Sequence, residues 1–191
     1  MVFKNEGKIA YANLFHMNGK RMATGKYLHK EIKDSVWVYF DEAGVLISKE
    51  NYKMGKKNGT SYIYLPDGTV SEERNFLNNQ EHGIFKQYFD ATKIKGQGNY
   101  VMGKLEGRVA YFYPNGVEVA AGFYKNGQKS GPWIYKHENG SVKERELYIN
   151  GKLASKKETD AFFSKTKTSG EPVKTPTKKV VDTNKKEENQ Y

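Results

Sequence analysis

Cysteine is absent from the sequence, proline occurs five times, and apolar residues make up only 37% of the 191 positions. The lack of cysteine excludes disulfides, thiolate metal sites and a cysteine nucleophile. No apolar run approaches membrane-spanning length, and residues 1–7 contain no hydrophobic core of an export signal. No stretch before Lys152 keeps a helical period for three turns, so the sequence does not favour a helical architecture.

Aromatic residues, in contrast, reach 14% and recur at a fixed spacing. Between Phe40 and Tyr148 an aromatic side chain stands at every twelfth position except Lys136. Glycines follow the doubled period of 24 in three series, with Thr92 and Asn79 in place of two of them. This regularity predicts an array of 24-residue units that bury their apolar surface against one another.

Each unit is predicted to be a strand, a tight turn, a second strand and a longer turn. Pro66-Asp67-Gly68 and Pro114-Asn115-Gly116 are typical of two-residue hairpin turns, and Asp90-Ala91-Thr92 is a weak copy. The longer turns are expected at 54–59, 78–83, 102–107 and 126–131. Consecutive strands with short connections pair antiparallel. We therefore predict an all-β fold over residues 1–153, an elongated single-layer antiparallel β-meander.

The two ends of the chain differ from the array. Residues 154–165 are predicted to form a short capping helix whose Phe162 and Phe163 cover the last strand, and residues 166–191 a disordered Lys/Thr/Pro tail. Phe3, Phe15 and Tyr27 already keep the spacing of twelve, so the sequence starts inside a repeat. We expect further repeats before Met1 and, with them, an exported native form; the sequence does not settle the compartment.

The net charge of +10 is spread along the chain. Residues 152–191 contain ten lysines and six acidic residues, hence +4, which leaves +6 on the first 151 residues. Such a distribution favours acidic partners weakly. It lacks the dense basic stripe of a nucleic-acid groove, so specific nucleic-acid binding is not expected.

Residues 124–135 (YKNGQKSGPWIY), followed by Asn139-Gly140, resemble the MORN repeat, and more closely its bacterial variant. The resemblance covers Phe3 to Lys152 and is strongest from Tyr100 to Gly151; Ser61, Val109 and Thr92 depart from the pattern. It implies a hairpin ribbon that serves as a scaffold or docking surface for proteins and sometimes acidic lipids. It also implies the antitoxin role and the export that are common among members of the bacterial variant.

No group of residues has the arrangement that catalysis or metal binding requires. The adjacent Glu72 and Glu73 point to opposite faces of a strand and cannot share one proton-transfer site. The glycine-rich segments lack the features of a phosphate loop. No two histidines have metal-ligand spacing. These histidines are His16, His29, His82 and His137. We predict no catalytic residue, cofactor or metal, and a protein that is not an enzyme.

Two columns of side chains lie three residues apart on the strands, so they face opposite sides of the sheet. The first contains Trp37, Ser61, Phe85, Val109 and Trp133; the second contains Phe40, Tyr64, Tyr88, Phe112 and Lys136. A single-layer sheet leaves each face partly uncovered, and exposed aromatics are common interface anchors. Candidate partner-binding residues are therefore Trp37, Phe85, Trp133, Tyr64, Tyr88 and Phe112. A purely structural role in packing along the repeat explains them equally well.

Lysines recur at the longer turns and could form one basic edge. These are Lys56, Lys57, Lys104 and Lys129. The alternative is that they keep the sheet soluble and block pairing at its edges. The sequence thus predicts a scaffold that binds another protein, of antitoxin or envelope type. The alternative function is attraction to an anionic polymer or membrane surface through the basic turns and tail.

Overall fold

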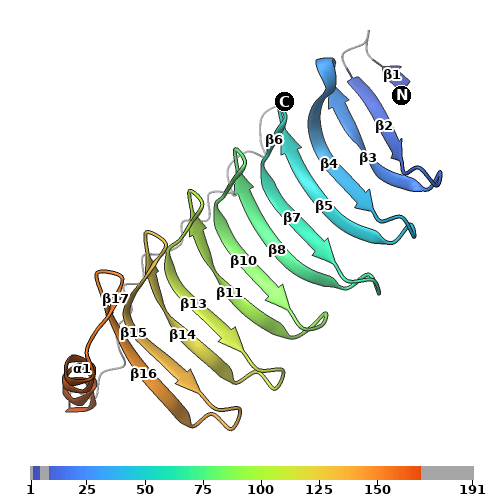
Figure 1. Ribbon diagram of the computed structural model, residues 1–191. Helices are drawn as coiled ribbons and strands as arrows, with labels where there is room; N and C mark the ends of the chain where they lie inside the picture. The colour runs from blue at the N-terminus through green and yellow to red at the C-terminus, as the bar shows by residue number, and fades with distance from the viewer. Residues whose placement is uncertain (1, 5–8, 169–191) are drawn as a thin grey trace, which may run out of the picture. The chain divides into compact units, whose positions relative to one another are not determined.

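The computed structural model describes residues 2–4 and 9–168, which form two compact units divided between Ala154 and Ser155. The first unit is an antiparallel sheet one layer thick, built from hairpins in chain order (Figure 1). This confirms the predicted all-β meander. Its strands are β1 Val2–Lys4, β2 Ile9–Phe15, β3 Arg21–Leu28, β4 Ile32–Phe40, β5 Leu46–Lys53, β6 Lys56–Lys57, β7 Gly59–Tyr64, β8 Val70–Leu77, β9 Gln80–Glu81, β10 Gly83–Tyr88, β11 Ile94–Val101, β12 Lys104–Leu105, β13 Gly107–Phe112, β14 Glu118–Lys125, β15 Gln128–Lys136, β16 Val142–Ile149 and β17 Lys152–Leu153.

Two kinds of turn alternate along this sheet, and the prediction assigned them the wrong way round. The two-residue turns lie inside the predicted longer turns: Met54-Gly55 joins Lys53 to its partner Lys56, and both turn residues have positive φ. The predicted tight turns are longer, because Leu65 N–H bonds to Thr69 C=O across three intervening residues. The loop is a type I turn that ends in Gly68 at φ +84°, and Pro66 suits it through its fixed φ. The same turn forms without proline at residues 41–45.

The weak turn copy at Asp90-Ala91-Thr92 is stabilised by a side chain instead of a glycine. The Asp90 carboxylate accepts bonds from the backbone N–H groups of Thr92 and Lys93 and from the Thr92 hydroxyl, each at 2.9 Å. Aspartate commonly closes turns in this way. Phe89 N–H still reaches Lys93 C=O at 2.8 Å, so the hairpin keeps the geometry of its neighbours.

Successive units are joined at their two-residue turns by backbone hydrogen bonds. Gly55 N–H donates to Lys33 C=O, and Asn79 N–H donates to Lys57 C=O. The same bond recurs from Gly103 to Glu81 and from Gly127 to Leu105. The polar groups of this edge are thus already paired within the sheet.

A row of side chains crosses one face of the sheet and fixes how its strands pack. Trp37 and Trp133 lie against glycines of the preceding strand, Gly25 and Gly122. Phe85 and Val109 both lie against Gly98. The row runs Ala12, Gly25, Trp37, Glu50, Ser61, Arg74, Phe85, Gly98, Val109, Gly122, Trp133 and Glu146. We call the face that carries it the tryptophan face. Large rings there have a glycine beside them, which lets a one-layer sheet bury aromatic surface.

Irregular backbone lies between β3 and β4, where the 12-residue phase of the sequence shifts. A short 3-10 helix spans His29–Glu31, and Glu31 and Ser35 have positive φ. The pairing of β3 with β4 shifts between Thr24 and Lys26. The extra residue is absorbed here without interrupting the sheet.

The second unit contains α1, Lys156–Thr168, which overlaps the predicted helix at 154–165 and continues three residues into the predicted tail. Ser155 begins it with a capping box: its hydroxyl accepts from Glu158 N–H at 3.3 Å, and the Glu158 carboxylate accepts from Ser155 N–H at 2.9 Å. That this helix covers the last strand stays a prediction. The predicted disordered tail lies, from residue 169 onward, outside the described residues.

Candidate functional site

The aromatic anchors proposed on the tryptophan face are buried. Trp37, Phe85 and Trp133 are 0%, 6% and 2% exposed. The expectation that a single-layer sheet leaves them partly uncovered is wrong, because each ring packs against a neighbouring glycine. Each indole also uses its N–H internally, from Trp37 to Lys26 C=O and from Trp133 to Phe123 C=O, both at 3.1 Å. Their surroundings indicate a packing role.

Two clusters on this face have the same composition, 96 positions apart. In the first, the Lys33 ammonium lies 4.7 Å from the Trp37 ring centroid and 2.7 Å from the Tyr39 hydroxyl, which it contacts as a donor. It also lies 5.2 Å from the Tyr52 ring centroid. A lysine enclosed by three rings is held by cation–π attraction and shields them from water.

The second cluster repeats this arrangement at Lys129. Its ammonium lies 4.4 Å from the Trp133 ring centroid and donates to the Tyr135 hydroxyl at 2.7 Å. Tyr135 in turn donates to the Glu146 carboxylate at 2.6 Å, and Tyr148 donates to the same oxygen at 3.0 Å. Burial lowers the pKa of Lys129, but its bonds to Tyr135 and Tyr148 outweigh this and leave the pKa raised.

Tyr135 gives the second cluster a pH dependence. Burial first, and then the bond to Glu146, raise the pKa of Tyr135 to about 12 from the ordinary 10.0. A tyrosine with a raised folded-state pKa stabilises the fold fully below pH 10, and this contribution is lost as the pH rises through 12. We expect the urea midpoints of the wild type and Tyr135→Phe to differ most below pH 10 and to converge toward pH 12. A difference that stays constant over this range would contradict the assignment.

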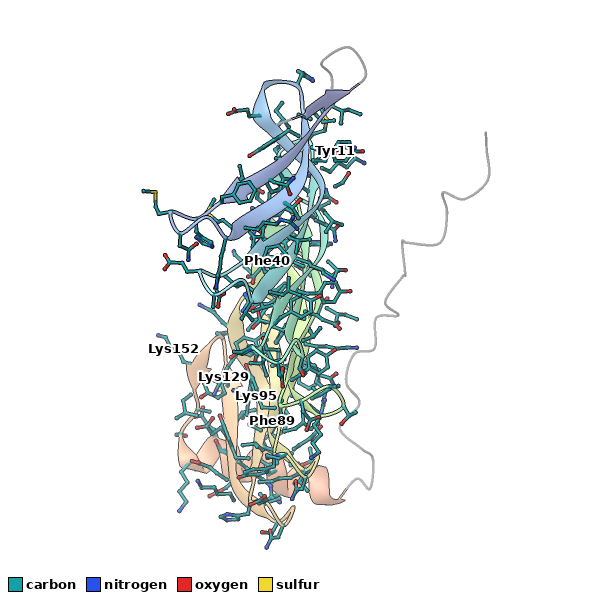
Figure 2. The ribbon with its side chains drawn as sticks, turned by 90° about the vertical axis from the view of Figure 1, so that its right-hand side faces the viewer. Tyr11, Phe40, Phe89, Lys95, Lys129 and Lys152 are labelled. Atoms are coloured by element: carbon teal, nitrogen blue, oxygen red, sulfur yellow. The ribbon has the colours of Figure 1, made fainter. Side chains whose placement is uncertain are left out.

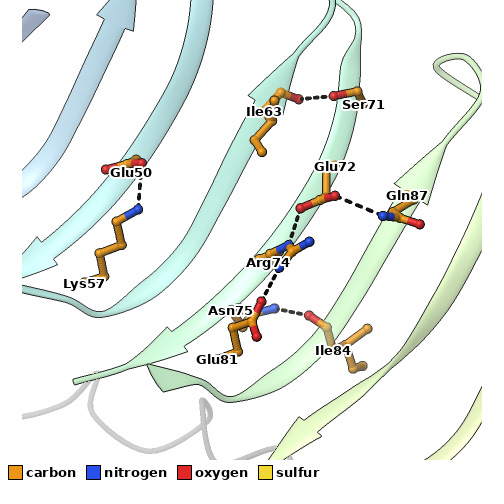
Figure 3. A network of polar contacts seen from close by, with 10 residues as sticks. All are labelled: Glu50, Lys57, Ile63, Ser71, Glu72, Arg74, Asn75, Glu81, Ile84 and Gln87. Atoms are coloured by element: carbon orange, nitrogen blue, oxygen red, sulfur yellow. Dashed lines mark hydrogen bonds and ion pairs between the residues drawn. The ribbon is translucent and has the colours of Figure 1, made fainter. Parts of the chain in front are cut away.

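Charged pairs occupy the middle of the tryptophan face (Figure 3). Lys57 donates to Glu50 at 2.8 Å, and Arg74 bonds to both Glu72 and Glu81. The signs are exchanged between units, because Arg74 occupies the position of Glu50 and Glu81 that of Lys57, each 24 residues further on. Burial raises the pKa of Glu50, but the bonds from Lys57 and Tyr52 outweigh this and lower it. These groups satisfy one another within the sheet.

The aromatics predicted on the other face lie there, half-buried. Tyr88 donates to Glu73 at 2.9 Å, and the Lys49 ammonium lies 5.5 Å from the Tyr64 ring centroid. Phe40 and Phe112 are also half-buried. Burial first, and then the bond to Glu73, raise the pKa of Tyr88 to about 12. Tyr64, Tyr88 and Phe112 keep accessible area, and their role in binding stays a prediction.

The predicted basic edge is divided between the two faces. Lys57 and Lys129 lie on the tryptophan face, where Glu50 and Tyr135 bind their ammonium groups. Lys56 and Lys104 lie on the opposite face and are exposed. Neighbouring residues of one strand point to opposite sides, so one turn cannot present both Lys56 and Lys57 on one surface.

Sequence reasoning missed a surface on this opposite face, beside the two-residue turns. Five directly paired residue couples form it, one from each unit between Lys53 and Lys152. They are Lys53 with Lys56, Leu77 with Gln80, Val101 with Lys104, Lys125 with Gln128, and Ile149 with Lys152. We call these ten residues the turn edge. The signal was present in the sequence, because its members recur every 24 residues. They can be assigned to one surface only once the positions of the two-residue turns, and hence the paired residues, are known.

The turn edge combines exposed aliphatic groups with unpaired positive charge. Leu77, Val101 and Ile149 are 39%, 41% and 47% exposed, although they stand on strands. Among the residues that the structure describes, no ion pair or side-chain hydrogen bond involves its lysines. These are Lys53, Lys56, Lys104, Lys125 and Lys152 (Lys152 is labelled in Figure 2).

Within residues 2–4 and 9–168, no three His, Asp or Glu side chains come together in a way that could hold a metal ion. In the same residues, no helix has the length and apolar character needed to cross a membrane.

Comparison with known proteins identifies repeats of one family. The model of the MORN repeat variant matches residues 33–54 and 129–150, the segments that contain the two lysine–tryptophan clusters. No curated protein matches the chain.

Solved structures share only limited likeness. A mutant of TarM from S. aureus, in complex with fondaparinux, alpha-GlcNAc-glycerol and UDP, is 17% identical over 50% of this chain and 19% of that one, with a TM-score of 0.36. The glycosylation-associated Gap123 complex of Streptococcus agalactiae is 13% identical over 72% and 25% of the two chains, with a TM-score of 0.33. The chain thus spans about a quarter or less of these proteins. The two matched segments are thus MORN repeat variants, and both lie within the hairpin array.

Proposed function

We propose that the chain is a non-catalytic scaffold that binds another protein along the turn edge, as an antitoxin-like docking module or an envelope scaffold would. One observation carries the proposal: Leu77, Val101 and Ile149 expose aliphatic surface at equivalent positions of three units. Such surface contributes little to the fold of this sheet. Exposed apolar patches with polar rims are typical of protein interfaces.

The tryptophan face is less suited to binding a partner than the turn edge. Its lysines, tyrosines and carboxylates bond to one another, and its largest rings are buried. A partner bound there would have to replace interactions that are already made. The turn edge presents groups that a partner can contact without such a cost.

The test is capture of the partner from cells that naturally produce the chain. A triple variant, Leu77→Ser, Val101→Ser and Ile149→Ser, is expected to lose a specifically captured protein that the wild type retains. The matched control carries serine at Ile47, Ile63 and Val142, which are 42%, 44% and 42% exposed but lie away from the edge. The control should bind as the wild type does.

Circular dichroism and urea midpoints of both triple variants separate binding from folding. We expect each midpoint to stay close to that of the wild type, because partly exposed side chains contribute little to stability. Equal capture by both variants would refute the turn edge as the binding surface.

A second candidate function is electrostatic attraction to an anionic polymer or membrane surface. The unpaired lysines of the turn edge favour it, since a lysine without an internal acidic partner is available to an external anion. We expect heparin or phosphatidylserine vesicles to bind at low salt and to be released as the salt concentration rises. Replacing Lys56, Lys104 and Lys152 with glutamine should weaken this binding. The equal-charge control replaces Lys20, Lys95 and Lys143 near the other turns.

A further inference from the structure

We propose that the turn edge binds an acidic, amphipathic α-helix of a partner protein that lies along the array. This rests on the proposed function and specifies the chemistry of its partner. Lysine and glutamine alternate in one column of the edge, as Lys56, Gln80, Lys104, Gln128 and Lys152. The structure places a positive group at every second unit of this column.

The paired column adds the apolar component. Its residues are Lys53, Leu77, Val101, Lys125 and Ile149. Leu77 and Val101 come from adjacent units, so exposed aliphatic surface extends from one to the next. Carboxylates and aliphatic side chains on one surface of the partner would match both columns.

Charge repulsion within the edge also points to an acidic partner. Lys53 and Lys56 are directly paired across β5 and β6, and like charges in this position destabilise a sheet. None of the acidic side chains that the structure describes forms an ion pair with either of them. A bound carboxylate would relieve this repulsion. The free protein already holds the two ammonium groups in the position where such a carboxylate would bind.

The backbone hydrogen bonding at the turn edge favours a helical partner segment over an extended strand. Adding a strand to a sheet requires free N–H and C=O groups. Here turns form the border, and Gly55, Asn79, Gly103 and Gly127 already donate their N–H groups to the preceding unit. A helix satisfies its own backbone and offers side chains alone. Recognition at this border must therefore proceed through side chains.

The repeat sets the spacing of acidic groups on the partner. Equivalent residues of successive units stand two strands apart, about 9.5 Å. Lys56 and Lys104, two units apart, are then separated by roughly 19 Å. On a helix that rises 1.5 Å per residue, this is about 13 residues, and the nearest spacing that returns to the same face at 3.6 residues per turn is about 14. A helix that reaches from Lys56 to Lys152 needs roughly 25 residues.

The probe is a synthetic helical peptide of about 29 residues, with glutamates about 14 residues apart and leucines between them on the same face. Fluorescence anisotropy measures its binding to the full chain. We expect Lys56→Gln/Lys104→Gln/Lys152→Gln to weaken binding about tenfold, since surface ion pairs are individually weak. The serine triple variant of Leu77, Val101 and Ile149 should weaken it as well. The control Lys20→Gln/Lys95→Gln/Lys143→Gln should leave it unchanged.

A second peptide with the same amino-acid composition in shuffled order shows whether binding depends on the spacing of the glutamates or only on net charge. Equal binding of both peptides, or binding of phosphatidylserine vesicles with none of the ordered peptide, would overturn the inference. Partner capture that depends on the aliphatic residues while the ordered peptide fails to bind would overturn the acidic helix alone. If capture of the partner does not depend on Leu77, Val101 and Ile149, the proposed function itself is refuted.

Discussion

Replacement of Trp133 by alanine is expected to lower the free energy of unfolding by about 3–5 kcal/mol, the usual cost of removing a large buried ring. The indole lies against Gly122, donates to Phe123 C=O and lies under the Lys129 ammonium. The variant loses all three interactions and leaves Lys129 without its principal aromatic contact. Urea unfolding followed by far-ultraviolet circular dichroism measures the effect.

The sequence supplies a built-in reporter for this experiment. Trp37 is the other of the two tryptophans, so the fluorescence of the variant comes from the opposite part of the array. Units of a repeat protein contact only their neighbours. We therefore expect Trp37 to report a nearly unchanged midpoint while the C-terminal units unfold earlier. Phe89→Ala, which truncates an exposed ring, serves as control. A comparable loss in that control would contradict the burial argument.

The substitution Gly122→Ala is expected to cost about 3 kcal/mol, although it adds only one methyl group. A Cβ at this position would lie 2.3 Å from Trp133 Cδ2 and 2.4 Å from Cε2, far inside van der Waals contact. The indole cannot yield, because the strand holds its base and Phe123 C=O holds its N–H. Chemical denaturation of the single variant gives the size of the effect.

A double-mutant cycle isolates the steric origin of this cost. In the background of Trp133→Ala, the substitution Gly122→Ala should cost less than about 1 kcal/mol, which gives a coupling energy of roughly 2 kcal/mol. Valine is not a suitable background, because Val109 occupies the same position one unit earlier and a Cβ on its neighbour Gly98 would still lie 2.8 Å from Val109 Cγ2. An equal cost in both backgrounds would show that Gly122 is required for its backbone and not for the ring.

The repeat and its faces were predictable because strand alternation converts a spacing of 24 into columns. Tyr64 and Tyr88 lie opposite the tryptophan column, as their three-residue offset from Ser61 and Phe85 requires. The helix at Lys156–Thr168 was recognisable from its interruption of the pattern. These features depend on local periodicity, which is visible in the sequence alone.

The turn types and the burial of the rings were harder to infer. A dipeptide such as Asp67-Gly68 suits several turns, and only the backbone hydrogen bonds of the loop distinguish them. Strand glycines such as Gly98 and Gly122 are typical of sites where another group approaches closely, a signal that the sequence analysis did not use. Their partners, however, come from neighbouring strands, and only the register shows which ring meets which glycine. The turn edge remained hidden for the same reason.

The alternation of large and small groups across the sheet also makes the units unequal as building blocks. Trp133 needs the strand of Gly122 before it, and the strand after it carries Glu146. A tandem copy of residues 131–154 inserted after the original would set a second indole beside Glu146, where the glycine that faces the ring in the original unit is missing. The array can therefore be lengthened only if a glycine-bearing strand is supplied with each new tryptophan. This restricts the order in which the 24-residue units can be joined.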